Sequence, residues 1–210
     1  AFENRLTETR EKNVFTYRNY YHGGGVALGA LTGDPLPEVV LTANQGGPRV
    51  FLNLGQFRFR DITKAAGLAT DADSWTTGVT LADVNGDGRL DIYLSRAGLA
   101  EPQERTNQLW VNRGVSDGFP RFEEMASKLG IADDGYSTHS AFLDYDRDGD
   151  LDLFILNNSP RPVTSFGERN VRNVRHRYGG HKLYRNNGDR FVDVSAAAGI
   201  YGSEVGFGLG

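Results

Sequence analysis

The stretch Asp144-Tyr145-Asp146-Arg147-Asp148-Gly149-Asp150-Leu151-Asp152 places five carboxylates within nine residues. At neutral pH these charges repel one another. A hard dication relieves that repulsion, because Ca²⁺ prefers about six to eight oxygen ligands. We expect side-chain oxygens from Asp144, Asp146 and Asp148, the backbone carbonyl of Asp150, and a closing carboxylate from Asp152.

This stretch opens like an EF-hand loop but leads into a strand. Gly149 permits the sharp turn that wraps the chain around an ion. The closing acid stands at the ninth position, whereas an EF-hand places it at about the twelfth. Residues 151–156 form an apolar run of β-forming residues rather than an amphipathic helix. The stretch therefore predicts an ion-binding loop set in a β-hairpin.

A second full copy of the loop lies upstream, between Asp83 and Asp91. Its carboxylates and amides recur at the same alternate positions, so we expect a second Ca²⁺ site there. The ligands that this copy offers are Asp83, Asn85, Asp87, the backbone carbonyl of Arg89, and Asp91. The alternative for either copy is a turn rich in Asp, Asn and Gly that binds no ion.

A third copy, at residues 30–38, is degraded. Ala30 removes the first ligand, and Pro35 takes the place of the glycine. We therefore expect no ion at this copy, and two Ca²⁺ sites in the chain.

The composition excludes several classes of protein. Of the 210 residues, 39% are hydrophobic, which is enough for a substantial core, but no apolar run approaches the length of a membrane span. The net charge of −4 gives no reason to expect nucleic acid as a partner. The chain has no cysteine, which excludes disulfides and thiol catalysis.

The expected compartment is extracellular or periplasmic. Ca²⁺ is plentiful outside cells, so loops of modest affinity suit a secreted protein. The sequence starts at Ala1 without a methionine or a signal sequence, which favours a mature or trimmed product.

Three anchors recur in the same order and define a repeat. The first is the acidic loop, whose copies begin 53 and then 61 residues apart. The second is a strand that ends in Asn and is followed by Gly: Val50 to Gly55, Leu109 to Gly114, and Leu183 to Gly188. The third is a strand led by Phe that runs into a small-residue turn: Phe59 to Leu68, Phe122 to Ile131, and Phe191 to Ile200.

Each repeat holds four short strands separated by turn residues, which is typical of a β-propeller blade. In the second repeat we expect them at Gly78–Ala82, Asp91–Ser95, Gln108–Asn112 and Arg121–Met125. The predicted fold is therefore all-β: a segment of a propeller with blades at about 22–75, 76–134 and 135–202. We expect residues 203–210 to begin a fourth blade. Within residues 1–21, Phe2-Glu3-Asn4 is a candidate closing strand. Since three blades and two partial blades do not close a ring, we expect part of a longer chain or a cut product.

With these motifs, nearly the whole chain from about Tyr20 resembles the FG-GAP or VCBS-type repeats of integrin α-subunit propellers and bacterial secreted proteins. The sequence pattern of each repeat is most similar to the branch that contains cartilage acidic protein and UnbV-like proteins. The resemblance implies a propeller fold and Ca²⁺ binding, and says little about activity because the fold carries many functions.

The third repeat carries a basic insertion at residues 159–182. From Arg161 to Lys182, six positive side chains stand against the single acid Glu168. One interpretation is a site for an anionic ligand, since arginine forks match carboxylate, sulfate or phosphate. The candidate ligand-binding residues are Arg169, Arg172, Arg175, His176, Arg177, Tyr178 and His181. The alternative is a solvated basic loop that pairs with the acidic loops nearby.

Two further histidines lie in the predicted inner strands. His139 has serine and threonine neighbours, and His22 precedes three glycines. Adjacency does not make a catalytic triad, so we favour an inner-strand role for His139 and assign no catalytic residue.

Three functions remain open at this point. The first is a Ca²⁺-stabilised binding or adhesion module for carbohydrate or protein. The second is a polysaccharide lyase or hydrolase with its site in the 159–182 insertion, which we favour less. The third is a structural assembly domain that self-associates through open blade faces.

Overall fold

A computed structural model describes residues 2–68, 74–159 and 176–200. It confirms the all-β prediction: the described residues form twelve strands, one short helix, α1 (Ala126–Leu129), and one 3₁₀ turn, η1 (Pro102–Glu104). The strands form three four-stranded antiparallel sheets. Sheet 1 comprises β1 (Val26–Gly29), β2 (Glu38–Leu41), β3 (Arg49–Asn53) and β4 (Phe59–Asp61). Sheet 2 comprises β5 (Thr76–Ala82), β6 (Asp91–Arg96), β7 (Gln108–Ser116) and β8 (Phe119–Glu124). Sheet 3 comprises β9 (Ser137–Leu143), β10 (Asp152–Asn157), β11 (Lys182–Asn186) and β12 (Phe191–Asp193).

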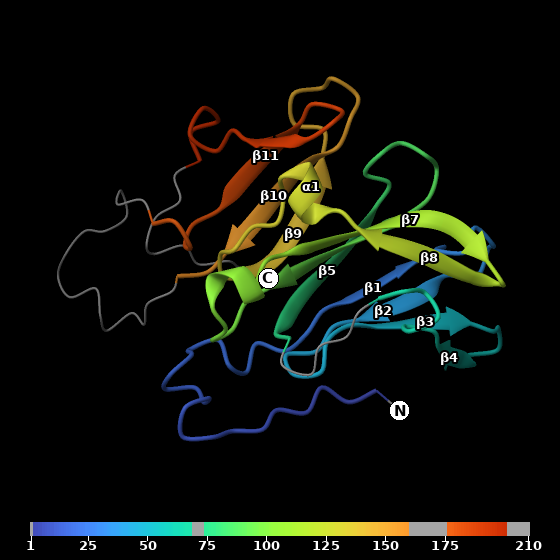
Figure 1. The fold of residues 1–210 in the computed structure, drawn as a ribbon, viewed down its shortest axis with the longest axis horizontal. Coiled ribbons are helices and arrows are strands. Elements are labelled where there is room, and N and C mark those ends of the chain that lie inside the picture. Colours follow the sequence, from blue (N-terminus) through green and yellow to red (C-terminus); the bar gives the residue numbers. More distant parts are fainter. Residues whose placement is uncertain (1, 69–73, 160–175, 201–210) are drawn as a thin grey trace.

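Every sheet is a meander in which each strand pairs with the next one along the chain. The first strands of the three sheets, β1, β5 and β9, lie next to one another, as the blades of a propeller require (Figure 1). Hydroxyl groups join these inner strands: Thr80 Oγ1 of β5 donates to the Ser140 carbonyl of β9 at 2.7 Å. The acidic loops therefore lie at one end of the inner strands.

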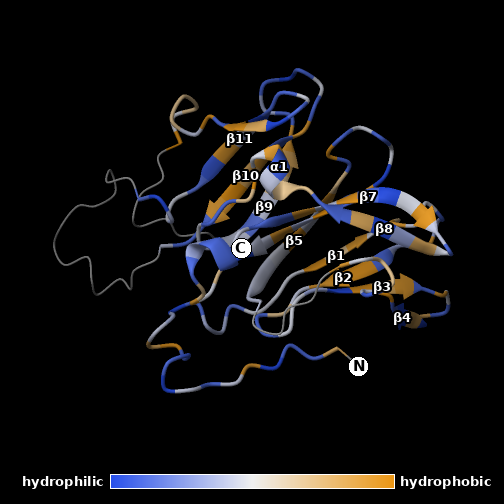
Figure 2. Ribbon diagram, in the orientation of Figure 1, coloured by the Kyte–Doolittle hydropathy of each residue, from blue (hydrophilic) through white to orange (hydrophobic). Residues whose placement is uncertain are grey.

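Two apolar cores fill the spaces between the sheets. The core between sheets 1 and 2 contains Val40, Val50, Ile92 and Trp110. The core between sheets 2 and 3 is formed by Tyr93, Leu109, Leu153, Ile155 and their neighbours. Sheet 2 thus packs on both faces, which explains why its strands are apolar without strict alternation (Figure 2).

The N-terminal segment covers part of the sheets without joining them. Residues 2–25 contain no strand, so the strand expected at Phe2-Glu3-Asn4 does not form in this structure. Instead, the rings of Tyr17 and Tyr20 contact Trp75, with ring centroids 5.6 and 5.1 Å apart. The indole of Trp75 is therefore part of a small aromatic core. The fourth blade expected at residues 203–210 lies outside the described residues.

A buried polar network joins the linker between α1 and β9 to sheet 3. The carboxylate of Asp133 is fully buried and forms an ion pair with Lys182. It also accepts hydrogen bonds from the Tyr184 hydroxyl at 2.9 Å and from the Asn157 amide at 3.2 Å. Every oxygen of this buried charge is satisfied, as buried charges require.

Replacing Lys182 with Met should lower the free energy of unfolding by about 3–5 kcal/mol, because it leaves Asp133 buried without its cation. Arg177→Met is the matched control: its ion pair with Asp134 is exposed on the arginine side, so its loss should change stability by about 0–1 kcal/mol. Urea unfolding of the two variants measures the difference. Equal losses would show that the buried Asp133–Lys182 pair contributes no more to stability than the exposed pair.

Candidate metal centre and neighbouring pockets

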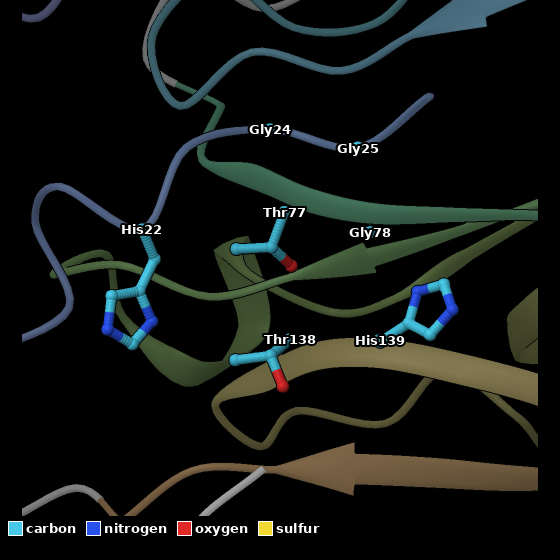
Figure 3. Close-up of a pocket in the computed structure, with 7 residues that line it drawn as sticks. All are labelled: His22, Gly24, Gly25, Thr77, Gly78, Thr138 and His139. Carbon is cyan, nitrogen blue, oxygen red and sulfur yellow. The ribbon is translucent and has the colours of Figure 1, made fainter. Parts of the chain in front are cut away.

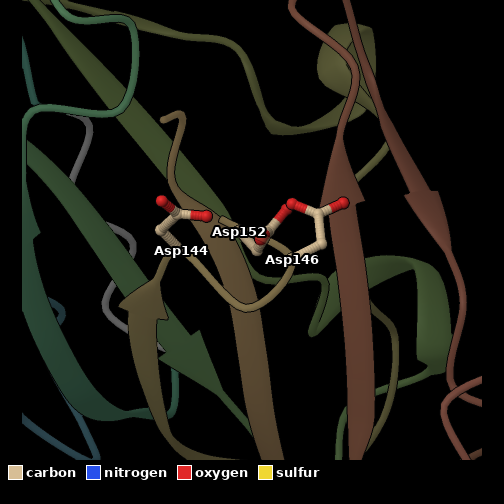
Figure 4. A group of neighbouring side chains, drawn as sticks. All are labelled: Asp144, Asp146 and Asp152. Carbon is tan, nitrogen blue, oxygen red and sulfur yellow. The ribbon is translucent and has the colours of Figure 1, made fainter. Parts of the chain in front are cut away.

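The loop between β9 and β10 brings three carboxylates together. Oxygen atoms of Asp144, Asp146 and Asp152 all lie within 4.8 Å of one another. Figure 4 shows the three side chains, which the single turn between these two strands supplies. Among the described residues, no other set of three acidic, histidine or cysteine side chains is gathered in this way.

Asp144 holds the turn closed. Its carboxylate accepts hydrogen bonds from the backbone amides of Asp148 at 3.1 Å and Gly149 at 3.2 Å. Two residues of the turn adopt left-handed backbone angles, Gly149 with φ 98° and Arg147 with φ 64°. An arginine in that region is strained, whereas the second copy has Gly86 at the same position.

Asp152 ties two distant parts of the sheet together. It is fully buried, and its two oxygens accept the amides of Tyr145 at 2.9 Å and Asn186 at 2.8 Å. Tyr145 opens the loop, and Asn186 ends β11. The closing carboxylate is therefore a backbone anchor as well as a candidate ligand, a role that we did not predict from the sequence.

The second loop repeats this anchoring. Asp91 is fully buried and accepts the amides of Val84 at 3.0 Å and Asn112 at 2.8 Å. Burial raises the pKa of Asp91 to about 6; the Asn112 and Val84 amides act in the opposite direction, and the charges of Asp87 and Asp83 add to the increase.

The rest of the second loop differs from the third. Asp83 accepts the Asp87 and Gly88 amides at 3.0 and 2.7 Å, as Asp144 does in its loop. The Asp87 carboxylate, however, is held by the guanidinium of Arg89 at 2.5 Å. The positively charged side chain of Arg89 thus pairs with Asp87, one of the expected ligands. The carboxylates of Asp83, Asp87 and Asp91 do not form a cluster like that of the third loop.

The degraded first loop keeps only the anchor. Glu38 is fully buried and accepts the Leu31 amide at 2.8 Å and the Thr32 amide at 3.2 Å. Ala30 offers no carboxylate. The expectation that no ion binds here stays a prediction.

The asparagines of the repeat complete each anchor. The side-chain amides of Asn53, Asn112 and Asn186 donate to the carbonyls of Pro37, Leu90 and Leu151, which immediately precede the closing acids. Their side-chain oxygens accept the amide of the glycine two residues later, at 2.9–3.0 Å. The Asn-x-Gly pattern is visible in the sequence, but its hydrogen bond to the end of the acidic loop is not.

The third loop fits a calcium ion. Three of its carboxylates converge, and one oxygen of Asp150 is buried without a hydrogen-bond partner. Burial raises the pKa of Asp150, and the negative charges of Asp148, Asp152 and Asp146 add to the increase. Asp148 accepts the Asp150 amide at 3.2 Å, which keeps it within the turn. Crowded, partly orphaned oxygens are the donor set that a hard dication satisfies.

The described part of the basic insertion lines a cavity of about 290 Å³. His176, Arg177 and His181 contribute to it, together with Lys182, Asp193 at the end of β12, and Ser195 in the turn that follows. Arg169, Arg172 and Arg175 lie outside the described residues. Burial lowers the pKa of His181.

Other contacts already engage several of these side chains. Arg177 forms an ion pair with Asp134 at 2.7 Å, and Lys182 with Asp133. The ring of Tyr178 lies 5.1 Å from the guanidinium of the buried Arg105, so this ring also packs within the fold. His176 and Arg177 line the cavity from the side of the insertion.

Asp193 and Ser195 do not form a nucleophile and base. Ser195 Oγ donates to Asp193 at 2.5 Å and accepts a hydrogen bond from the Leu183 amide of β11 at 2.9 Å. Sheet 1 repeats the arrangement with Thr63 and Asp61 at 2.6 Å. A pair that recurs away from the cavity is a structural feature of the repeat.

A second cavity, of about 460 Å³, lies beside the inner strands. His22 and His139 line its opposite sides, with Thr77 and Thr138 between them (Figure 3). A Cβ atom on Gly78 would lie 2.6 Å from the Thr138 carbonyl, so glycine is required where β5 approaches β9. His139 therefore occupies an inner strand, as its position in the repeat predicts.

Comparison with known proteins agrees with the geometry. A model of the FG-GAP-like repeat matches residues 31–94. Cartilage acidic protein 1 of Xenopus tropicalis is 29% identical over 160 residues, covering 73% of this chain. The human and mouse proteins of the same name are 30% and 29% identical over 139 residues, covering 65%. Residues 31–94 therefore carry an FG-GAP-like repeat, the family that the motifs predict.

The FG-GAP match starts within the first loop and ends in β6, so it includes the whole second loop. The third sheet follows the same plan in its strand order and in its closing acid. The chain spans 24%, 20% and 21% of the length of the frog, human and mouse relatives. None of its described helices has the length and apolar character needed to cross a membrane.

The two roles of the loop acids can be separated by mutation. Asp152→Asn should lower the free energy of unfolding by about 2–4 kcal/mol even in chelator, because an amide cannot accept both backbone donors. Asp146 makes no side-chain hydrogen bond within the described residues, so Asp146→Asn should not lower stability in chelator, where it relieves repulsion, and should remove the stabilisation by Ca²⁺. Urea unfolding with and without Ca²⁺ measures both. Equal losses for the two variants in chelator would contradict these separate roles.

Proposed function

We propose that this FG-GAP chain is a Ca²⁺-stabilised, extracellular binding module for a carbohydrate or protein ligand that carries acidic groups. The observation that supports it best is the convergence of Asp144, Asp146 and Asp152 within 4.8 Å, in a turn that the fold holds in shape. Ca²⁺ is abundant outside cells, and the curated relatives are named for cartilage, so we infer an extracellular location for the chain.

In this proposal Ca²⁺ neutralises the charge of the β9–β10 loop. Asp144, Asp146 and Asp152 would hold it, with the unpartnered oxygen of Asp150 nearby. Asp144 keeps the turn closed through backbone amides, and Asp152 connects it to β11. Because the unfolded chain has no preformed site, binding energy becomes folding energy. The loop at 83–91 is the weaker candidate, since Arg89 competes for Asp87.

The proposed ligand surface is the cavity beside β11. His176 and Arg177 line it on the side of the basic insertion. An arginine fork suits a carboxylate or sulfate group, and imidazole can donate to a sugar hydroxyl. Binding is favoured over hydrolysis or elimination because the acid and hydroxyl at this cavity, Asp193 and Ser195, bond to each other and to the backbone.

Calcium should raise thermal stability once its free concentration exceeds the dissociation constant. At a free concentration about 100 times the dissociation constant, the expected stabilisation is about 2.7 kcal/mol per site. A melting curve in chelator, compared with one in Ca²⁺, measures it; Mg²⁺ should have less effect because it dehydrates reluctantly. Identical curves with and without Ca²⁺ would refute the calcium site.

Ligand binding should depend on Arg177. Arg177→Ala should weaken binding of a uronate-containing or sulfated oligosaccharide by about tenfold, or about 1.4 kcal/mol. Arg113→Ala is the matched control, because Arg113 also forms an exposed 2.7 Å ion pair, with Glu123, but lies in sheet 2 away from the cavity. Titration calorimetry at fixed salt gives both affinities. Equal weakening would indicate non-specific attraction, and no binding by the wild type would exclude acidic glycans.

A further inference from the structure

The sequence contains two Asn-Gly pairs, and both lie in exposed turns. Asn85-Gly86 belongs to the second acidic loop, and Asn187-Gly188 to the turn between β11 and β12. Asparagine is a thermally labile residue. It is most labile before glycine, because no side chain there hinders attack of the glycine nitrogen on the asparagine carboxamide. The two pairs share this local sequence and their exposure, so the fold must account for any difference between them.

The second loop leaves the attacking nitrogen available. The Gly86 amide donates no hydrogen bond within the described residues. The side chain of Asn85 folds forward along the chain: its Oδ1 accepts the Asp87 amide at 3.1 Å, and its Nδ2 donates to the Asp87 carboxylate at 3.0 Å. These bonds hold the carboxamide on the side of Gly86, and the amide that donates to Oδ1 polarises the carbonyl that would be attacked.

The other pair is held in the opposite way. The Gly188 amide donates to Asn186 Oδ1 at 3.0 Å, so its nitrogen is engaged. The side chain of Asn187 folds backward, where its Oδ1 accepts Arg185 Nε at 2.9 Å. A reaction at Asn187 must break both bonds first. The fold therefore protects Asn187 and leaves Asn85 open to attack.

We propose that Asn85 is a site of spontaneous deamidation. The Gly86 nitrogen bonds to Cγ of Asn85, its proton passes through water to the departing Nδ2, and ammonia leaves. The product is a cyclic succinimide, which a second water molecule opens at either carbonyl to give aspartate or isoaspartate at position 85. The reaction needs no oxidant, reductant or enzyme, and it adds one negative charge to the loop.

The new carboxylate has a defined place in the loop. Position 85 corresponds to Asp146, one of the three converging carboxylates of the third loop. The aspartate product therefore has acids at all three corresponding positions, 83, 85 and 91. It also replaces the amide that donates to Asp87 with a group of the same charge as Asp87. Deamidation thus destabilises the loop in chelator and strengthens its binding of Ca²⁺; this second effect rests on the calcium sites proposed above.

Peptide mapping by mass spectrometry tests the site. The folded chain, kept in chelator at mildly alkaline pH, should deamidate at Asn85 about tenfold faster than at Asn187, which corresponds to about 1.4 kcal/mol in activation free energy. In urea, where the hydrogen bonds of the fold are lost, the two pairs should react at similar rates. Equal rates in the folded chain, or the same difference in urea, would overturn the proposal.

Gly86→Ala identifies the attacking group. A Cβ atom on Gly86 would meet no other atom within 4 Å, and Arg147 occupies the corresponding position of the third loop with φ 64°, so the variant should fold. It should deamidate at Asn85 about tenfold more slowly than the wild type. Gly188→Ala is the matched control, because it has the same open space and should leave the rate at Asn85 unchanged. An unchanged rate in Gly86→Ala would refute attack by the backbone.

Asn85→Asp separates the modification from its effect on calcium. This variant carries the aspartate product from the start, so it should melt at a lower temperature than the wild type in chelator. It should also gain more thermal stability from Ca²⁺ than the wild type does. A smaller gain would contradict the calcium role of this loop, whereas the rates measured by mass spectrometry decide the deamidation itself.

Discussion

A buried carboxylate at the start of the second strand supports each sheet of this fold. Glu38, Asp91 and Asp152 are fully buried, and each accepts the amide of the residue that follows the first position of its own loop. Asp91 and Asp152 also accept the amide of the asparagine that ends the third strand. Hydrogen bonds to a charged group contribute about 1.5–3 kcal/mol each, so this single side chain connects three strands of a blade.

In our proposal Ca²⁺ binds to this frame rather than creating it. In the 144–152 loop, the anchored Asp152 also belongs to the carboxylate cluster, so its structural role and its proposed ligand role meet in one residue. In the 83–91 loop, Arg89 supplies a positive charge where the third loop has Asp150, and the anchor remains. In the 30–38 loop only the anchor is kept. The three loops thus share the same backbone anchor but differ in how much negative charge the chain leaves unpaired.

Much of the fold could be predicted from the repeated sequence, because the Asn-x-Gly and Phe-led anchors set the strand order and the sheet boundaries. The four strands of sheet 2 occur where they were expected, with ends that differ by at most four residues. What the sequence did not reveal depends on contacts across the fold. The partner of Asn112 lies 21 residues upstream, and the engagement of Tyr178 by Arg105 joins distant loops. The aromatic packing of Trp75 by an N-terminal segment without strands follows from no local pattern.

The most direct test of the buried anchor is amide hydrogen exchange of the chain in chelator, followed residue by residue. The amides of Val84, Asn112, Tyr145 and Asn186, which donate to Asp91 and Asp152, should exchange about as slowly as the core of their sheets even without Ca²⁺. Rapid exchange of these four amides in chelator, while the sheets stay protected, would show that the carboxylates do not hold the blades together.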